Sequence, residues 1–169
     1  MVYTAIDNNA VKIRIKLIID STTTLVNKTT PSKSLLRQVR VGAPPNNEYK
    51  DLNHPALVIT NAERWMEEQR RGPVIARAKS SVSTVVRYDI ILMVHKEVSE
   101  SAEKEVDRLF KLIEEQLYKF DNLQKPVDGT DPLCNSLILE TTRRIPQFVG
   151  QEIDGFKATL SVEILPNDS

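Results

Sequence analysis

The chain has 169 residues, 40% hydrophobic and 27% charged, which is typical of one globular domain with a single core. Its 23 basic and 23 acidic residues cancel, so no net charge would attract nucleic acid or an anionic membrane. No run approaches the roughly 20 apolar residues of a membrane-spanning helix. The N-terminus also lacks a signal-peptide pattern. We therefore expect a protein that acts in the cytoplasm or in a particle assembled there.

The first predicted element covers residues 8–27. Apolar side chains recur there at spacings of three and four, which favours a helix capped by Asn8 or Asn9. Part of this segment also alternates as a strand would, but the pattern is longer than a typical strand. Residues 35–41 then alternate well enough for a short strand that ends at Gly42.

Two buried strands are expected next. Residues 43–55 combine prolines, asparagines and charges, which is typical of an exposed loop. Residues 56–60 are apolar throughout and predict a short strand at the centre of a sheet. Residues 84–94 are rich in β-branched side chains and predict a longer strand, with Arg87 and Asp89 on the same face.

The segment between these strands is ambiguous. Residues 61–73 favour one or two helical turns, from an Asn61 cap to a Gly-Pro stop. Residues 74–84 are small, polar and weakly basic, and they predict no regular element. We therefore expect an extended loop or arm over about residues 61–83.

The clearest predicted helix covers residues 102–120. Its apolar side chains form one helical stripe: Ala102, Val106, Leu109, Phe110, Ile113, Leu117 and Phe120. Ser99 or Ser101 is expected to cap its N-terminus. Acidic residues crowd its first turns and Lys119 lies near its end, as the helix dipole favours.

The chain is expected to close with a β-hairpin. Residues 121–135 hold two prolines and an Asp-Gly pair, and they predict a loop. Residues 137–145 and 156–164 then predict two paired strands, the second with clear alternation. The predicted fold is one α+β domain over residues 1–169. It has a mainly antiparallel sheet, with an N-terminal helix and one long central helix packed on one face.

His95 is the main candidate for a catalytic base or a metal ligand, because Glu97, Glu100 and Glu103 follow it closely. A zinc site on one helix would place two ligands four residues apart within that helix. His95 precedes the helix, and the helix dipole explains the acids. We therefore interpret His95 as a structural residue where a strand turns into a helix, and we expect no metal site.

Other catalytic patterns are missing from the sequence. The five glycines are scattered, so no phosphate-binding loop is present, and the single Cys134 has no His or Cys near it in sequence. We expect no catalytic residue, no cofactor and no enzyme activity. The alternative is a small ligand-binding or enzymatic α+β domain. Its pocket would gather His54, His95, Asp51 and Arg87.

Residues 61–83 hold the side chains best suited to contact another protein, because Trp and Arg are enriched at the centres of interfaces. We predict that four of them lie at or near a contact with a neighbouring subunit: Trp65, Arg70, Arg71 and Arg77. The alternative is that Trp65 covers a small cluster within the monomer.

The order of elements resembles the tail terminator family of tailed viruses, the lambda-type ring proteins at the head-proximal end of the tail. The resemblance covers most of residues 8–165 and is carried by "HPALVIT", "VVRYDIILMVHKEVSESAEKEVDRLFKLIEEQL" and "LILETTRRIPQFVGQEIDGFKATLSVEI". The segment from Asn61 to Ser83 is longer than its counterpart in the family. Related tail-completion, neck and head-closure proteins share a similar fold.

The resemblance implies a structural virion protein that forms a six-membered ring and ends the growth of the tail tube. Its expected partners are further copies of itself, the tail tube protein and the head–tail connector protein. The contact predicted for Trp65, Arg70, Arg71 and Arg77 would then be with a neighbouring subunit or with the tail tube. It implies no membrane partner and no specific nucleic-acid binding, although DNA would pass through the ring. The expected location is the head–tail junction of the virion, after assembly in the host cytoplasm.

Overall fold

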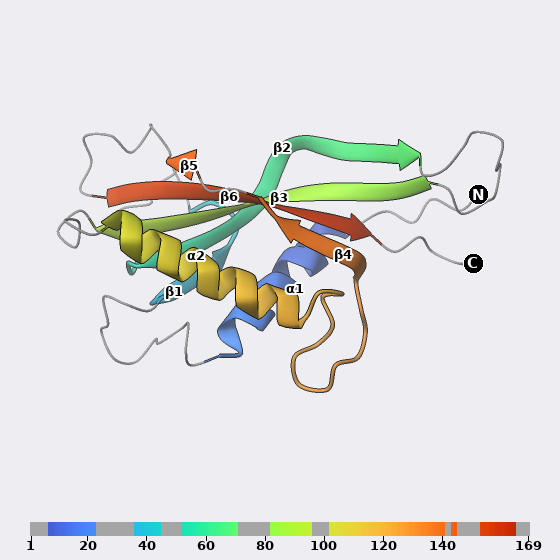
Figure 1. Cartoon of the computed structure of the whole chain (residues 1–169), viewed down its shortest axis with the longest axis horizontal. Coiled ribbons are helices and arrows are strands. Elements are labelled where there is room, and N and C mark those ends of the chain that lie inside the picture. The colour runs from blue at the N-terminus through green and yellow to red at the C-terminus, as the bar shows by residue number, and fades with distance from the viewer. Residues whose placement is uncertain are drawn as a thin grey trace.

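The computed structural model describes residues 7–22, 36–44, 52–70, 82–95, 102–140, 143–144 and 153–164. Within these ranges, two helices lie against one face of a long, twisted sheet (Figure 1). The elements are α1 (Asn8–Asp20), β1 (Gln38–Val41), β2 (Ala56–Arg70), β3 (Val82–His95), α2 (Ala102–Lys119), β4 (Cys134–Leu139), β5 (Arg143–Arg144) and β6 (Ile153–Ile164). The predicted α+β class and the placement of both helices on one face are confirmed.

The sheet is mainly antiparallel, as predicted. Its described strands follow the order β1-β2-β3-β6-β4, and the short β5 pairs with β6. Only the β1–β2 pair in this described sheet is parallel. The predicted closing hairpin is confirmed, because β4 pairs with β6 in a register that sets Leu139 opposite Leu160.

The N-terminal helix forms as predicted, with a different cap and an earlier end. Asp7 is the N-cap, and its Oδ1 accepts a hydrogen bond of 3.0 Å from the Ala10 amide. A short carboxylate in this position satisfies an amide that has no partner within the helix. The expected caps, Asn8 and Asn9, are therefore one and two residues late. The helix ends at Asp20, and Ser21 closes it by donating to the Ile18 carbonyl.

The main core lies between the helices and the sheet. Alternate residues of the central strands face the helices, as strand geometry requires. β3 contributes five of them, and the largest of those that are fully buried is Tyr88. Its hydroxyl donates to Asn8 Oδ1 at 2.9 Å, and burial raises the pKa of this phenol. The sheet is thereby tied to the first turn of α1.

The helical turns predicted for residues 61–73 are wrong over residues 61–70, which continue β2. They pair with β3 from Met66 opposite Val86 to Arg70 opposite Val82, after an irregularity that begins at Asn61. One or two isolated helical turns are marginal in water, whereas a strand alongside β3 gains a ladder of hydrogen bonds. Residues 71–81 lie outside the described residues.

The helix predicted for residues 102–120 is confirmed as α2, which ends at Lys119. The expected caps, Ser99 and Ser101, lie outside the described residues. The loop after α2 is confirmed, but it ends two residues earlier than expected, because Cys134 begins β4. β1 ends before Gly42, as predicted, and the φ of 84° at Gly42 is a conformation that glycine adopts at little cost.

Candidate interaction surfaces

The two histidines occupy the same end of the sheet. His54 is buried, and its Nδ1 lies 3.5 Å from the Met93 carbonyl oxygen. His95 is the last residue of β3, where its backbone pairs with Ile153. The side chain of His95 lies outside the described residues, so its structural role stays a prediction.

Arg87 lies far from the end of the sheet that holds both histidines. It lies eight residues before His95 on the extended strand β3, a separation of about 27 Å at the usual strand rise. Asp51 lies outside the described residues. Arg87 is therefore too far along β3 to share a small pocket with His95, whereas a pocket of His54 and His95 stays a prediction. In the ranges that the structure describes, no group of three or more His, Cys, Asp or Glu residues could hold a metal ion.

The four predicted contact residues fall on or beyond β2. Trp65 lies in the irregular part of this strand and Arg70 is its last residue. Their side chains lie outside the described residues, as do Arg71 and Arg77 entirely. Their position at a subunit contact stays a prediction.

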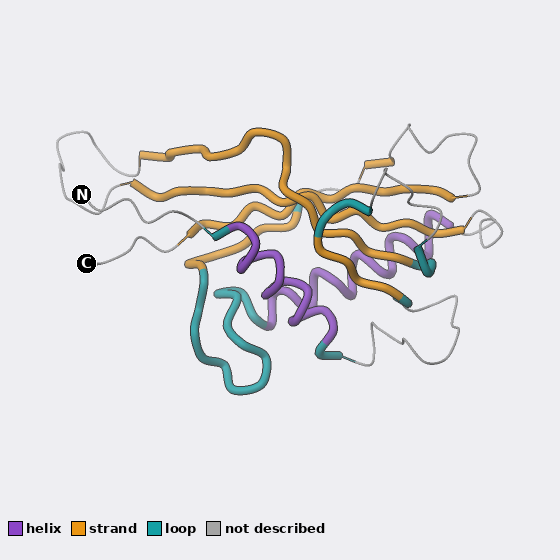
Figure 2. Tube along the Cα trace, turned by 180° about the vertical axis from the view of Figure 1, so that it is seen from behind, coloured by secondary structure: helices purple, strands orange, loops and turns teal. Residues whose placement is uncertain are grey.

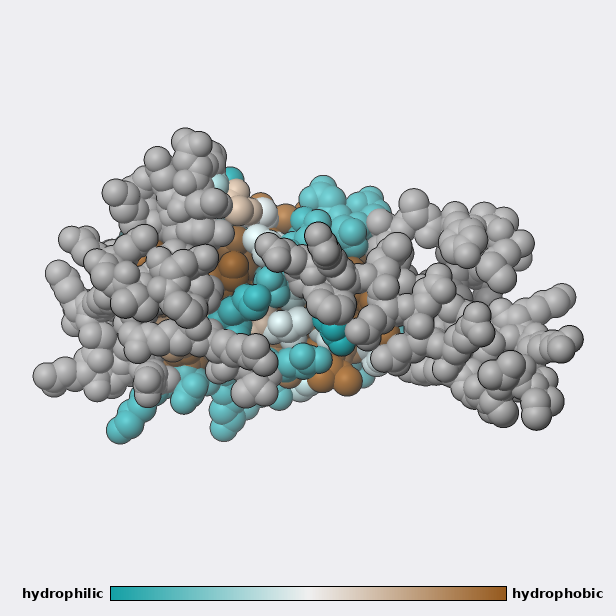
Figure 3. Space-filling model, turned by 90° about the horizontal axis from the view of Figure 1, so that it is seen from above, coloured by the Kyte–Doolittle hydropathy of each residue, from teal (hydrophilic) through white to brown (hydrophobic). Residues whose placement is uncertain are grey.

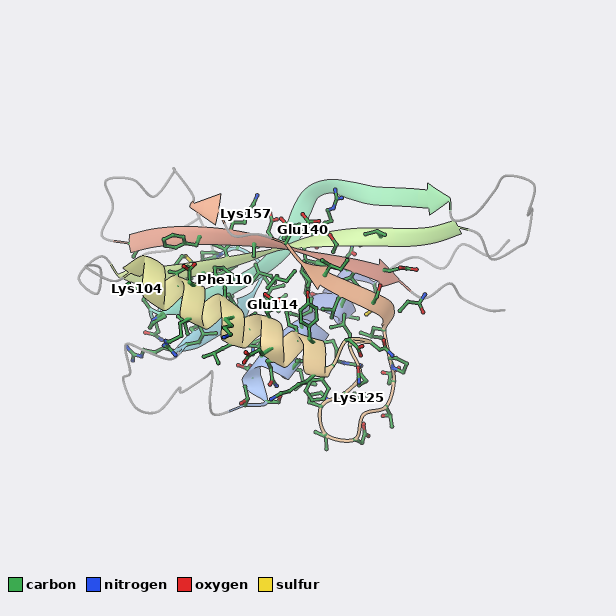
Figure 4. All side chains as sticks on the ribbon, viewed as in Figure 1. Lys104, Phe110, Glu114, Lys125, Glu140 and Lys157 are labelled. Atoms are coloured by element: carbon green, nitrogen blue, oxygen red, sulfur yellow. The ribbon has the colours of Figure 1, made fainter. Side chains whose placement is uncertain are left out.

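The sheet face away from the helices is polar along its centre (Figure 3). Arg87 and Asp89 share this face, as predicted, and both are half-buried. Lys157 Nζ lies 3.5 Å from Asp89 Oδ2, which joins β6 to β3. Towards β4, the other neighbour of β6, the Ser161 hydroxyl donates to Glu140 Oε1 at 3.4 Å. Figure 4 shows Lys157 and Glu140 on the side of the sheet opposite α2. Charges of both signs are therefore paired across neighbouring strands.

The same face becomes apolar towards the end that holds the histidines. A second, smaller cluster is buried there, formed by Ala56, Val58, Ile91, Met93 and Ile153, with Leu52 packed against it. This end of the sheet is therefore buried on both faces, which explains why residues 56–59 are apolar without alternation.

The β4 edge of the sheet lies beside α2. The Leu139 amide, which points away from β6, donates to the Tyr118 hydroxyl at 3.4 Å. A side chain from α2 thus accepts a hydrogen bond from one outward-facing amide of this edge strand. Such contacts limit uncontrolled pairing at an edge strand.

The loop between α2 and β4, residues 121–133, is fastened to α1 by Arg14. The guanidinium of this buried arginine donates to the Leu123 carbonyl at 2.7 Å, to the Asp131 carbonyl at 2.7 Å and to Asp131 Oδ2 at 2.9 Å. Both acceptor residues have positive φ angles, 51° at Leu123 and 56° at Asp131. The fork of the guanidinium matches these acceptors, which hold the loop in a defined conformation.

The tip of this loop is also internally bonded. The Lys125 amide donates to the Thr130 carbonyl and the Gly129 amide to the Lys125 carbonyl, both at 2.8 Å. Asp128 accepts hydrogen bonds from the hydroxyl and the amide of Thr130. These two bonds hold the pKa of Asp128 below its usual range, and its carboxylate is solvent-exposed. The tip is therefore an ordered turn that presents an ionised acid.

Exposed apolar side chains lie on this same side of the molecule. Val127, at the loop tip, is 92% exposed, while Ile13 and Leu17 on α1 are 51% and 45% exposed. The sequence interpretation missed all three, although Ile13 and Leu17 are visibly apolar residues outside the predicted stripe of α1. Nothing local marks Val127, because its exposure depends on how the loop projects.

No family model matches this chain, and no curated protein matches it. In the part of the chain that the structure describes, no helix is long and apolar enough to cross a membrane.

Proposed function

We propose that this chain is the subunit of a six-membered ring that terminates the tail tube of a tailed virus and joins the tail to the head connector. The observation that carries the proposal is the hairpin formed by β2 and β3, which runs past both helices at one end of the sheet (Figure 1). β6 supports β3 there from Thr84 onward, but beyond Ile59 no described strand pairs with the outer side of β2. Residues 66–70 therefore form an open sheet edge, which a neighbouring subunit can cover.

Two further features support a ring of identical subunits. Trp65 and Arg70, two of the residue types enriched at interfaces, belong to β2, the strand with this open edge. The element order, from the N-terminal helix to the closing hairpin, is the order on which the resemblance to tail terminators rests. A fold alone does not imply a function, so the open edge is the stronger support.

The proposal predicts closed rings. The purified chain at tens of micromolar should form them alone or after addition of the tail tube protein of the same virus. Native mass spectrometry would count the subunits, and negative-stain electron microscopy would show whether the assembly is closed. A chain that remains monomeric under both conditions would overturn the proposal.

A further inference from the structure

The tip of the loop between α2 and β4 combines order with an exposed apolar side chain. Val127 is almost fully exposed, although its loop is fixed at the base by Arg14 and at the tip by backbone hydrogen bonds. An apolar side chain on a rigid projection loses little conformational entropy when a partner covers it. The Val127 side chain is therefore suited to insert into an apolar surface of a partner, and we call it the knob.

A matching apolar surface lies on the outer face of α1. Ile13 and Leu17 are one helical turn apart and point away from the core, which α1 contacts through Val11, Ile15, Ile18 and Ile19. In the view from behind, α1 lies in front of the sheet with the loop beside it (Figure 2). The knob does not cover its own α1, because Val127 and both helix residues remain exposed.

Charges beside the two apolar surfaces are complementary. Asp128 follows Val127 at the tip and is ionised, and the nearby cation Lys125 has its Nζ 3.8 Å from Asp131 Oδ2. On α1, the half-buried residues Lys12 and Lys16 carry positive charge. Lys16 already pairs with Asp20 at 2.6 Å, so Lys12 is the cation better placed for an acid from another molecule. Opposite charges at the rim of an apolar contact favour one orientation over others.

We infer that copies of this chain join head to tail, with the Val127 tip of one copy seated on the Ile13–Leu17 face of α1 in the next. The inference rests on the proposed ring and names a second contact between its subunits, besides the one proposed for the β2–β3 hairpin. The two surfaces are different parts of one chain, so the contact is heterologous and closes into a ring when the rotation between copies allows it. Arg14 fixes the angle between the tip and α1 within each copy, and therefore fixes that rotation.

Cross-linking between two single-cysteine variants tests the contact. Ile13→Cys chains and Val127→Cys chains of different mass are mixed and mildly oxidised. A covalent pair with one chain of each kind is expected, and little product from either variant alone. The native Cys134 should not interfere, because it is buried and its raised pKa keeps it a thiol.

Substitutions at the same surfaces give a second measurement. Val127→Asp should weaken ring association on the order of a hundredfold, because it would bury a charge against apolar side chains. Asp128→Asn keeps the acceptor for Thr130 but removes the charge, so it should weaken association by roughly threefold. Val127→Ile, which keeps the knob apolar, is the matched control and should assemble as the wild type does.

The outcomes separate this contact from the ring itself. Wild-type rings that form while the mixed cysteine variants give no covalent pair would overturn the contact and leave the ring standing. Cross-linked pairs of Ile13→Cys alone would mean that α1 packs on α1, and would also overturn it. A wild-type chain that never forms rings would remove the proposed function.

Discussion

At the scale of single residues, Arg14 shows how one side chain can organise a distant segment. A buried guanidinium is costly unless its donors are satisfied, and three acceptors from residues 123 and 131 surround this one. Two of the acceptors are backbone carbonyls of the loop between α2 and β4. The arginine therefore both pairs a charge and completes the hydrogen bonding of the loop.

Replacing Arg14 with Met should lower the free energy of unfolding by about 2–3 kcal/mol, because the Leu123 and Asp131 carbonyls would lose their donors. Urea denaturation would measure this loss. Asp131→Asn is the matched control. It keeps both backbone acceptors and removes only a half-exposed carboxylate, so it should cost less than about 1 kcal/mol. Equal losses in the two variants would contradict the role assigned to the carbonyls.

Cys134 makes stability depend on alkaline pH. Burial raises the pKa of its thiol from 9.0 to about 12, because ionisation within the core is disfavoured. The thiol is neutral in both states below pH 9, so its contribution is complete there. Between about pH 9 and 12 the unfolded chain loses the proton first, and stability falls as pH rises. Urea denaturation at pH 8 and pH 10 should show a smaller pH effect for Cys134→Ala than for the wild type.

At the scale of elements, the sequence predicted best those whose burial is visible in their own periodicity. The stripe of α2 and the alternation of residues 156–164 follow from one face meeting the core, and both elements are present. α1 also follows from its stripe, but its cap shifted to Asp7, since several neighbouring polar residues could serve. The exact ends of a helix depend on which nearby polar residue caps it more than on the periodicity of its apolar residues.

β2 shows why the remaining elements could not be predicted. Residues 61–70 favour a helix locally, yet their structure is decided by pairing with β3, which begins only at Val82. The surfaces of the inferred contact were harder to predict than the elements. Ile13 and Leu17 are recognisable in the sequence as apolar residues outside the helical stripe. The exposure of Val127 is not, because it depends on how the loop is joined to α1.

The end of the β2–β3 hairpin carries the arginines predicted to contact a neighbour. Arg70→Glu combined with Arg71→Glu should weaken ring or tube association, because the change opposes any acidic partner surface. The melting temperature of the folded monomer should stay nearly unchanged. Sedimentation velocity and thermal unfolding would measure the two effects.

The matched control places the same charge change on α2, at exposed Lys104 and Lys111. These variants should assemble normally. Unchanged association in the hairpin variant, together with collapse of the monomer in Trp65→Ala, would assign the hairpin to the core instead of an interface.

At the scale of the whole molecule, the two faces of the sheet differ in what they offer a partner. The helix side carries the knob and the apolar face of α1, while the opposite side carries paired charges of both signs. A contact between copies through the helix side would leave the polar face and the β2–β3 hairpin accessible. The hairpin could then form a second contact, with a neighbouring subunit or with the tail tube, without competing for the same surface.

Hydrogen bonds join α1 to segments of the chain that are synthesised much later. Arg14 bonds to residues 109 and 117 positions later, and Gln116 bonds to the Ile18 carbonyl across 98 positions. Contacts so distant in sequence slow folding, because the intervening chain must first be ordered. α1 is synthesised before the other described elements but reaches its full set of contacts only after Asp131 is made. A nascent chain that does not yet include Asp131 cannot fix the angle between the tip and α1, so newly made subunits would enter rings only after translation has passed that residue.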